Sequence, residues 1–585
     1  MKHRADAKQT QKWLIVAIVI VVLFAIGTGA FLLGHSSSSQ ESVSDSATEK
    51  VTSSTDPLDP YAQYRVPGWI AAENAKPGST NWAVPEDKTA WSKVEGFFNA
   101  TSINLGSSVI LKTSTRAPAW QVTAYRMGWY GGTGGRLIWK SEPLPGVNQP
   151  KVEQVGAPKA WSAPWSTSLV IQTDETWPPG QYLFKLESVD NGASYVPLVI
   201  RDDKSTSDIL MQSAVTTWQA YNGWGGASVY TGNTGRADAV SFDRPYTGNG
   251  SGEFLGRERE FIAFVERLGL DVSYWTDIDL HQRGELAKNH RAVVIPGHDE
   301  YYTVEMRKNL EAARDAGVNI GFFGANNVYR RIRLEPAASG PNRHEINYRD
   351  AGRDPLSGKD PEHVTTSFRE SPAPNPESSL TGSYYECNPV DADWVVGDTS
   401  MWMFDGSGFK NGEKIAHMVG NEYDRVNLSV PTPANIQILA HSPVTCRGTN
   451  SYADSTWYSA PSGAGVFAAA TFGWSPLMLD ACPAGTPSTP VCKLQKVTEN
   501  ILRAFAKGPA GAAHPSVSNL SKFPMSAPHA ATPTSPETPA PEPSSTTTPT
   551  TVAPQKTTTS TSSTTTSTTT TSTTTSTTNT TTSIP

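Results

Sequence analysis

A histidine and two carboxylates follow a short apolar run in the segment VVIPGHDEYYT, which spans residues 293–303. Side chains such as those of His298, Asp299 and Glu300 bind protons or metal ions, and the apolar run before them is typical of a buried strand. In a structural interpretation, Asp299 and Glu300 lie at the start of a helix, where the helix dipole favours anions. In a chemical interpretation, the same dipole keeps Glu300 ionised and available as a ligand.

Two further segments carry polar and aromatic side chains directly after predicted strands. The strand that begins at Ile209 leads into TTWQAYNGWGGASVY, and the strand that begins at Val318 leads into GANNVYRRIR. In open parallel sheets, ligands bind outside the carboxyl ends of the strands. The alternative is that Trp224 and Tyr230 are core aromatics beside a glycine turn. We expect one shared site, lined by Tyr221, Asn222, His298, Asp299, Glu300, Tyr301, Asn326 and Asn327.

Strands and helices alternate along residues 206–507. The predicted strands are SDILMQSAV, LDVSYW, AVVIPG, VNIGFFG, NIQILA and GVFAAATFGW, and the predicted helices are REREFIAFVERLG, VEMRKNLEAARDAG and KLQKVTENILRAFAKG. This alternation predicts an α/β domain with a mostly parallel sheet and helices on both faces. Residues 57–205 instead contain short alternating segments separated by Pro and Gly, which predict an all-β, Ig-like sandwich. Within it, GWYGGTGGR lacks a following helix and is predicted to be a hairpin, not a phosphate loop.

The N-terminal region has the features of a membrane anchor. An apolar stretch at 13–33 is about 31 Å long as a helix, close to the thickness of a hydrocarbon core. The basic residues in 1–12 place the N-terminus in the cytoplasm and the rest of the chain outside it. A cleaved signal peptide is the alternative. Residues 34–56 are a Ser-rich linker. The expected location is therefore the cell membrane, with one span and the folded domains outside.

Residues 508–585 are rich in Pro, Thr and Ser and are predicted to be a disordered, O-glycosylated stalk. Contact of this tail with the cell wall and formation of a homo-oligomer both stay open. The net charge of −7 argues against a nucleic-acid partner, which would require a basic face. The four cysteines of a translocated chain are expected to form two disulfides, Cys482–Cys492 and Cys387–Cys446.

Two of three enzyme templates fit the chain poorly. No GxSxG nucleophile elbow occurs in the sequence, and all four cysteines can be used in disulfides. Metal-assisted chemistry is the template that remains. Oxygen ligands from Tyr and Glu, with a histidine nearby, suit a hard cation such as ferric iron better than zinc.

Several separated motifs resemble the large-subunit family of N,N-dimethylformamidase over roughly residues 95–507. They are GFFNATSINLGSSVILKT, YRMGWYGGTGGR, TTWQAYNGWGGASVY, GHDEYYT, FFGANNVYRRIR and GNEYDRV. The resemblance implies a β domain beside a glutamine-amidotransferase-like α/β domain. It also implies a mononuclear iron held by two tyrosines and a glutamate, with a histidine and an asparagine nearby.

The resemblance assigns roles to individual residues. Tyr221 and Glu300 correspond to metal ligands, and His298 and Asn326 to neighbouring groups that orient the substrate. Glu422 corresponds to a further acid. For the second tyrosine, spacing favours Tyr182, and Tyr301 competes with it.

These observations favour an anchored extracytoplasmic hydrolase that cleaves the C–N bond of a small amide with the help of iron. In this hypothesis His298 or Glu422 moves the proton and Asn326 orients the substrate. The rival hypothesis is a non-catalytic surface protein that binds carbohydrate or protein through its 17 tryptophans. A hydrolase of a different bond is a third alternative.

Overall fold

The computed structural model describes residues 59–85, 93–233, 235–483, 485 and 487–525. The predicted cytoplasmic N-terminus, the span at 13–33 and the linker at 34–56 lie outside these residues, as does the tail beyond Met525. None of the helices in the described ranges has both the length and the apolar character needed to cross a bilayer.

The first part of the described chain is built of strands, as the alternating pattern predicts. One sheet has the order β1-β3-β9 and the other the order β2-β11-β10-β4-β5. Rings from both sheets meet in one core, where Phe98 and Phe184 have centroids 4.8 Å apart. The Ig-like style of this sandwich stays a prediction. Its strands are β1 (Val94–Phe98), β2 (Ser102–Asn104), β3 (Ser108–Thr115), β4 (Ala119–Met127), β5 (Gly135–Lys140), β6 (Leu144–Pro145), β9 (Leu169–Gln172), β10 (Gly180–Ser188) and β11 (Ala193–Arg201).

The second part contains a mixed, mostly parallel sheet with the order β14-β12-β15-β17-β25-β24-β23. Its first five members are parallel, and β24 and β23 extend the edge through two antiparallel pairings, β25–β24 and β24–β23. Counted along the chain within this sheet, the parallel strands have the order 2-1-3-4-5, which places a topological switch point between β12 and β15. The strands are β12 (Ile209–Ser213), β14 (Val272–Thr276), β15 (Ala292–Ile295), β17 (Asn319–Phe322), β23 (Gln437–Cys446), β24 (Thr449–Ser459) and β25 (Gly465–Ala468).

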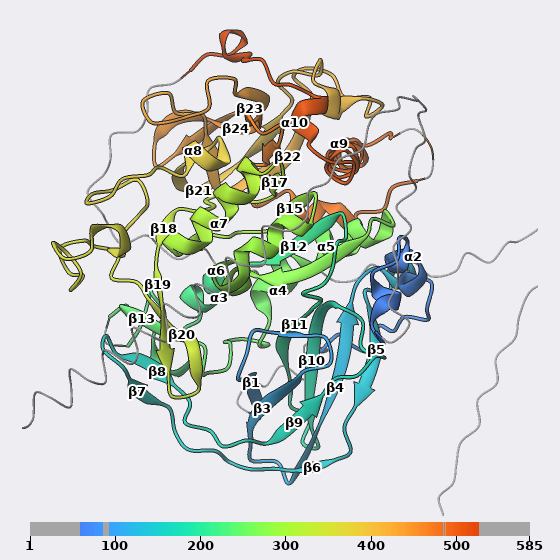
Figure 1. Ribbon diagram of the computed structural model, residues 1–585, viewed down its shortest axis with the longest axis vertical. Coiled ribbons are helices and arrows are strands. Elements are labelled where there is room, and N and C mark those ends of the chain that lie inside the picture. The colour runs from blue at the N-terminus through green and yellow to red at the C-terminus, as the bar shows by residue number, and fades with distance from the viewer. Residues whose placement is uncertain (1–58, 86–92, 234, 484, 486, 526–585) are drawn as a thin grey trace, which may run out of the picture. The chain divides into compact units, whose positions relative to one another are not determined.

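Helices cover both faces of this sheet, because successive residues of each strand point to opposite sides. Ile209 and Met211 share one core with helices α5 and α9, whereas Leu210 packs with α7 on the other face. Figure 1 shows α4 and α5 between this sheet and the sandwich strands. The helices are α2 (Trp69–Asn74), α3 (Val215–Tyr221), α4 (Gly252–Arg257), α5 (Arg259–Arg267), α6 (Asp277–Arg283), α7 (Val304–Asp315), α8 (Ser378–Thr381), α9 (Pro490–Phe505) and α10 (Ala510–Ala513).

A long hairpin docks on the carboxyl end of the parallel sheet. It consists of β21 (Tyr384–Val395) and β22 (Lys414–Arg425), which are antiparallel. Asp424 N donates to Ala470 O (3.2 Å) in the segment after β25. Three smaller sheets are made from β7 (Glu153–Val155), β8 (Ala160–Ser162), β13 (Ala239–Ser241), β16 (Tyr301–Tyr302), β18 (Arg330–Arg331), β19 (Arg333–Ala337) and β20 (Gly340–Ile346).

Both predicted disulfides are confirmed, as Cys387 bonds to Cys446 and Cys482 to Cys492. The predicted start of the disordered tail at residue 508 is too early. Residues after α9 pack against the α/β domain, because Ala510 is buried and the Asn519 side chain hydrogen-bonds Ile438 and Asp398. The folded chain therefore extends at least to 525.

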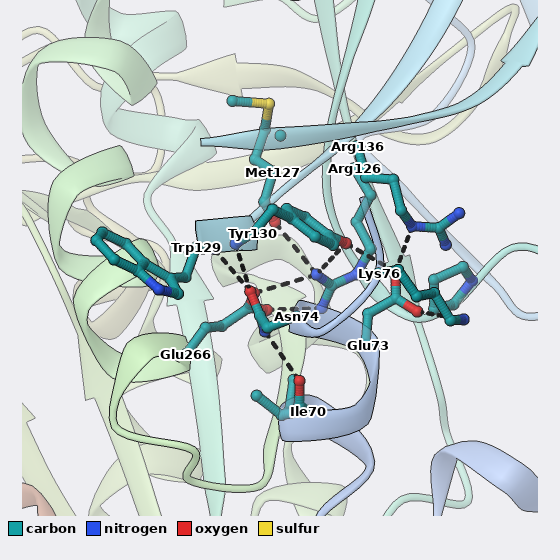
Figure 2. A network of polar contacts seen from close by, with 12 residues as sticks. Ile70, Glu73, Asn74, Lys76, Arg126, Met127, Trp129, Tyr130, Arg136 and Glu266 are labelled. Carbon is teal, nitrogen blue, oxygen red and sulfur yellow. Dashed lines mark hydrogen bonds and ion pairs between the residues drawn. The ribbon is translucent and has the colours of Figure 1, made fainter. Parts of the chain in front are cut away.

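A buried polar network joins the sandwich to α5 (Figure 2). Arg126 on β4 pairs with Glu266 on α5 at 2.6 Å, and both side chains are fully excluded from solvent. Asn74 at the end of α2 donates to Glu266 (3.0 Å) and accepts from Tyr130 N (2.8 Å). The Tyr130 hydroxyl donates to Glu73 (2.8 Å). The β4–β5 hairpin, whose turn was predicted from GWYGGTGGR, thus packs against α2 and α5.

Candidate active site

Two tyrosine hydroxyls converge on one carboxylate oxygen beyond the carboxyl ends of β12 and β15. Tyr221 OH lies 3.1 Å from Glu300 Oε2, and Tyr230 OH lies 3.0 Å from the same atom. Tyr221 ends α3, and the chain then turns back at Gly225, whose φ is 84°. Val229 N donates to Ala220 O (3.0 Å), which brings the Tyr230 ring to 4.5 Å from that of Tyr221.

Glu300 is fixed by its backbone as well as by its side chain. Its N–H donates to Thr217 Oγ1 (2.9 Å) on α3, and its carbonyl accepts from the N–H of Arg330 (2.8 Å). The Arg330 guanidinium also lies 3.4 Å from Glu300 Oε1 as an ion pair. Burial opposes ionisation of Glu300, but its cationic neighbours His298, Arg330 and Arg349 hold its pKa below the usual value. The fully buried carboxylate therefore stays charged.

His298 lies between two carboxylates. Its Nε2 is 3.4 Å from Glu300 Oε2 and 4.0 Å from Glu422 Oε2. This nitrogen is buried and forms no hydrogen bond with any described residue. Burial disfavours the imidazolium, but Glu300 and Glu422 outweigh it and raise the His298 pKa. Phe472, which comes after β25, packs on the imidazole with ring centroids 4.5 Å apart.

Asn326 and Glu422 complete the cluster. Asn326 Nδ2 donates to Glu422 Oε2 (2.7 Å), and Asn326 N donates to Asp424 Oδ1 (2.8 Å). Asn326 comes after β17 and has a φ of 55°, a backbone conformation that asparagine tolerates. Asn326 Oδ1 is buried without a hydrogen-bond partner among the described residues. Burial raises the Asp424 pKa to about 7.

Asp299 belongs to the framework beneath the cluster. Its Oδ2 accepts from Gln212 Nε2 and from Tyr302 OH, both at 2.8 Å. Burial raises its pKa to about 6. The helix α7 begins only at Val304, and Thr303 caps it. Asp299 and Glu300 therefore do not lie in its first turn, so the helix-start interpretation of this segment is wrong.

The structure brings together five of the six residues singled out from the sequence: Tyr221, His298, Glu300, Asn326 and Glu422. Tyr182 is not among them, because it points into the sandwich core. Its hydroxyl donates to Pro178 O (2.7 Å), and its ring stacks on Trp177. Tyr230, and not Tyr182, is the second tyrosine whose hydroxyl lies against Glu300. Tyr301 is fully buried, and its hydroxyl donates to that of Tyr230.

The donor atoms of this cluster suit a hard cation. Two phenol oxygens and a carboxylate oxygen meet within hydrogen-bond distance, and Glu300 Oε1 is buried without a hydrogen-bond donor in the described part of the chain. Oxygen-only sets of this kind favour ferric iron over zinc. In the described ranges, no group of three His, Cys, Asp or Glu side chains is arranged to hold a metal ion. A metal ion at this cluster would therefore need the tyrosine oxygens as ligands.

The fold and the site define an α/β protein whose tyrosine- and carboxylate-lined cluster lies at the switch point of a doubly wound sheet. Residues 121–484 match the family model described as N,N-dimethylformamidase beta subunit-like, C-terminal. The chain belongs to this N,N-dimethylformamidase beta subunit-like family, which confirms the resemblance seen in its motifs.

Other comparisons add little. No curated protein matches the chain. Among solved structures, a Paenibacillus sp. cycloisomaltooligosaccharide glucanotransferase complexed with cycloisomaltoheptaose is 7% identical over 45% of this chain and 35% of that chain, with a TM-score of 0.14. A TM-score this low supports no conclusion about fold or function.

Proposed function

We propose that this protein hydrolyses the C–N bond of a small amide, as the family name suggests, at the cluster around Glu300. The observation that carries the proposal is the meeting of Tyr221 OH and Tyr230 OH at Glu300 Oε2, at 3.1 and 3.0 Å. The overall reaction joins one water to one amide and yields a carboxylic acid and an amine. For N,N-dimethylformamide, the products are formic acid and dimethylamine.

Tyr221, Tyr230 and Glu300 are the residues that would hold an iron ion. When bound, such an ion supplies Lewis acidity, which polarises a carbonyl or lowers the pKa of a water. The protein contributes the fixed orientation of the three ligands. Thr217 and Arg330 anchor the Glu300 backbone, and the glycine turn at Gly225 holds the two tyrosine rings together.

His298, Glu422 and Asn326 are the residues that handle the proton and orient the substrate. His298 Nε2 and Asn326 Oδ1 are buried and form no hydrogen bond with the described residues, so His298 Nε2 can donate to an amide carbonyl and Asn326 Oδ1 can accept from a water. Glu422 accepts from Asn326 and lies 4.0 Å from His298. A proton taken from water can pass to His298 or Glu422 and then to the leaving nitrogen.

Among the residues of the cluster, the two tyrosines keep some exposure to solvent. Tyr221 and Tyr230 are half-buried, whereas His298, Glu300, Asn326 and Glu422 are buried. This burial favours a small neutral substrate over a large or charged one, because the groups of the cluster exclude bulk water. Low polarity in turn strengthens the electrostatic interactions that stabilise a developing charge.

The rival role in carbohydrate or protein binding has less support. It relied on tryptophan-lined surfaces, and each tryptophan in the described residues is buried or half-buried. Convergence of the polar side chains at one point favours chemistry over surface binding.

The cellular setting is part of the same proposal. Residues 13–33 anchor the chain with its folded domains outside the cytoplasm, and the two disulfides fit an oxidising environment.

The domain type is also part of the proposal. The 2-1-3-4-5 order of the parallel strands is the order of a flavodoxin-type fold, which supports a glutamine-amidotransferase-like domain.

The test is the iron content of the purified full-length protein, measured by mass spectrometry together with its visible spectrum. We expect about one iron per chain and a tyrosinate-to-iron absorption band. Glu300→Gln should lose both, along with hydrolysis of N,N-dimethylformamide. The matched control is Glu335→Gln, because Glu335 lies on β19 with a side chain that is 42% exposed. A wild-type protein that folds normally but binds no iron would overturn the iron mechanism.

A further inference from the structure

Glu422 is held by amide donors on both of its oxygens. Asn326 Nδ2 donates to Oε2 (2.7 Å), and Asn388 Nδ2 donates to Oε1 (3.1 Å). Asn388 comes from β21, the strand that pairs with the one carrying Glu422. It is buried, with 5% of its surface exposed, and no feature of its sequence surroundings marked it as a site residue.

Asn388 is itself held by Arg447, which lies between β23 and β24. Arg447 Nε donates to Asn388 O (2.8 Å), and Arg447 Nη2 donates to Asn388 Oδ1 (3.0 Å). The second bond fixes which end of the amide faces Glu422, because an Oδ1 that accepts from Arg447 leaves Nδ2 to donate. Arg447 thus sets the orientation of the amide.

A disulfide bond links the two segments that carry Asn388 and Arg447. Asn388 and Arg447 each come directly after a half of the Cys387–Cys446 disulfide, whose Cα atoms are 6.3 Å apart. The disulfide joins β21 to the end of β23, two strands that belong to different sheets. Without this bond, only the hydrogen bonds and packing between the two segments would keep Arg447 against Asn388.

We infer that Asn388 is a positioning residue for the proposed hydrolase, which orients Glu422 for proton transfer and is held in place by Arg447 and the Cys387–Cys446 disulfide. The inference rests on the proposed function for its catalytic meaning. Its structural part, the orientation of Glu422, does not depend on which amide is the substrate.

The charged groups around Glu422 decide what a change at residue 388 does. His298 lies 4.0 Å from Glu422 and also pairs with Glu300. The charge of Glu422 helps to raise the pKa of Asp424 and of Tyr221. A carboxylate in place of the Asn388 amide would stand about 3 Å from Glu422 Oε1, and two carboxylates so close share a proton. Asn388→Asp should therefore move the acidic limb of the pH profile to higher pH.

The experiment compares full-length wild type with Asn388→Leu and Asn388→Asp, and measures kcat and KM for N,N-dimethylformamide against pH. We expect Asn388→Leu to lower kcat about 10- to 100-fold with little change in KM or iron content, as for other residues that orient a catalytic group. We expect Asn388→Asp to move the acidic limb upward by about one pH unit. The matched control is Asn450→Ala, because Asn450 pairs with Thr445 at the exposed turn beside Arg447.

A second comparison isolates the disulfide. The double variant Cys387→Ala/Cys446→Ala should lower kcat in the same direction as Asn388→Leu. The double variant Cys482→Ala/Cys492→Ala removes the other disulfide and should leave kcat unchanged. Equal effects of the two double variants would show that the Cys387–Cys446 bond has no special link to the site.

A crystal structure of Asn388→Leu separates this inference from the proposed function. If wild type has neither iron nor activity, the proposed function fails, and a rotated Glu422 side chain in the variant still supports the positioning role. An unmoved Glu422, or an unchanged kcat in an active enzyme, would overturn the inference.

Discussion

Arg126 and Glu266 form an ion pair between β4 of the sandwich and α5 of the α/β domain, with Nη2 and Oε1 2.6 Å apart and no exposed side-chain surface. Tyr274 OH donates to the same carboxylate, and Tyr130 OH accepts from the guanidinium (2.9 Å). Helix α5 comes directly after Glu258, and the Glu258 side chain accepts from Ala214 N beside the start of α3. The Arg126–Glu266 pair therefore helps to hold the helices next to the candidate site in place.

Breaking this pair on one side should destabilise the protein strongly. Arg126→Met or Glu266→Met leaves a buried charge without its partner, and each should cost about 3–5 kcal/mol of unfolding free energy. The double variant should lose clearly less unfolding free energy than the two single variants together, because no buried charge is left without a partner. Chemical denaturation of all three measures this, with Arg503→Ala as a control in an exposed pair. Strictly additive losses would show that the two residues do not interact.

Substitution of the tyrosines tests which of them are ligands. Tyr221→Phe and Tyr230→Phe should each weaken iron binding and change the tyrosinate absorption band, since each removes one oxygen at Glu300. Tyr182→Phe should keep the band and lose only about 1 kcal/mol of stability, because its hydroxyl bonds Pro178 O in the sandwich core. Loss of the band in Tyr182→Phe alone would restore the spacing-based assignment.

Stability should fall as pH rises from about 4 to about 8, in part because of Glu258. Burial raises its pKa to about 8, well above the value of about 4.3 in an unfolded chain. Between these values the folded state keeps a proton that the unfolded state has released. The contribution of neutral Glu258 is therefore complete below about pH 4 and is lost as pH passes 8.

Glu258→Gln should flatten this dependence. Each unit of difference between the folded and unfolded pKa contributes about 1.4 kcal/mol, and the neutral amide has no such dependence. Thermal unfolding of both proteins from pH 5 to pH 9 measures the effect, and the variant should gain stability relative to wild type toward pH 9. Parallel curves would show that Glu258 ionises normally in the folded protein.

The proposed membrane anchor at residues 13–33 predicts the behaviour of truncated chains. The full-length protein should stay with membranes after an alkaline carbonate wash, because a helix of this length is stable in the bilayer. A chain that lacks residues 1–34 should be released, whereas one that lacks 526–585 should not. Release of the full-length chain by the wash would contradict a membrane span.

Much of the site was predictable because parallel strands deliver their carboxyl ends to one edge. Tyr221, His298, Glu300 and Asn326 each come after a predicted strand, and all four meet in the structure. Their apolar strands are short and bounded by turn residues, so the sequence alone indicates both the strands and the polar segments at their carboxyl ends.

Tyr182 was misplaced for a reason of strand geometry. Successive residues of β10 face opposite sides, and Gln181 is the one that faces β12, where its Oε1 accepts from Ser213 Oγ (3.2 Å). Tyr182 therefore lies on the other side of β10, where it packs in the sandwich core. Spacing along the chain carries no information about which side of β10 faces the site.

Tyr230 and Asn388 needed tertiary contacts that local patterns do not specify. Tyr230 lies in the segment TTWQAYNGWGGASVY, but its return to Tyr221 depends on how the glycine turn closes. Around Asn388 the pairing of β21 with β22 changes register between Cys387 and Val390. This irregularity breaks the two-residue period from which the facing side of a strand is inferred.

The residues of the candidate site are far apart along the chain, with a separation of 79 residues from Tyr221 to Glu300 and of 96 from Asn326 to Glu422. A chain made from its N-terminus onward cannot assemble this site until the β21–β22 hairpin has emerged and docked. The three proposed iron ligands all lie within residues 221–300, so they emerge before Glu422 does. Hydrolytic activity, and not metal binding alone, would then report complete maturation of the chain, because shorter folding intermediates lack Glu422.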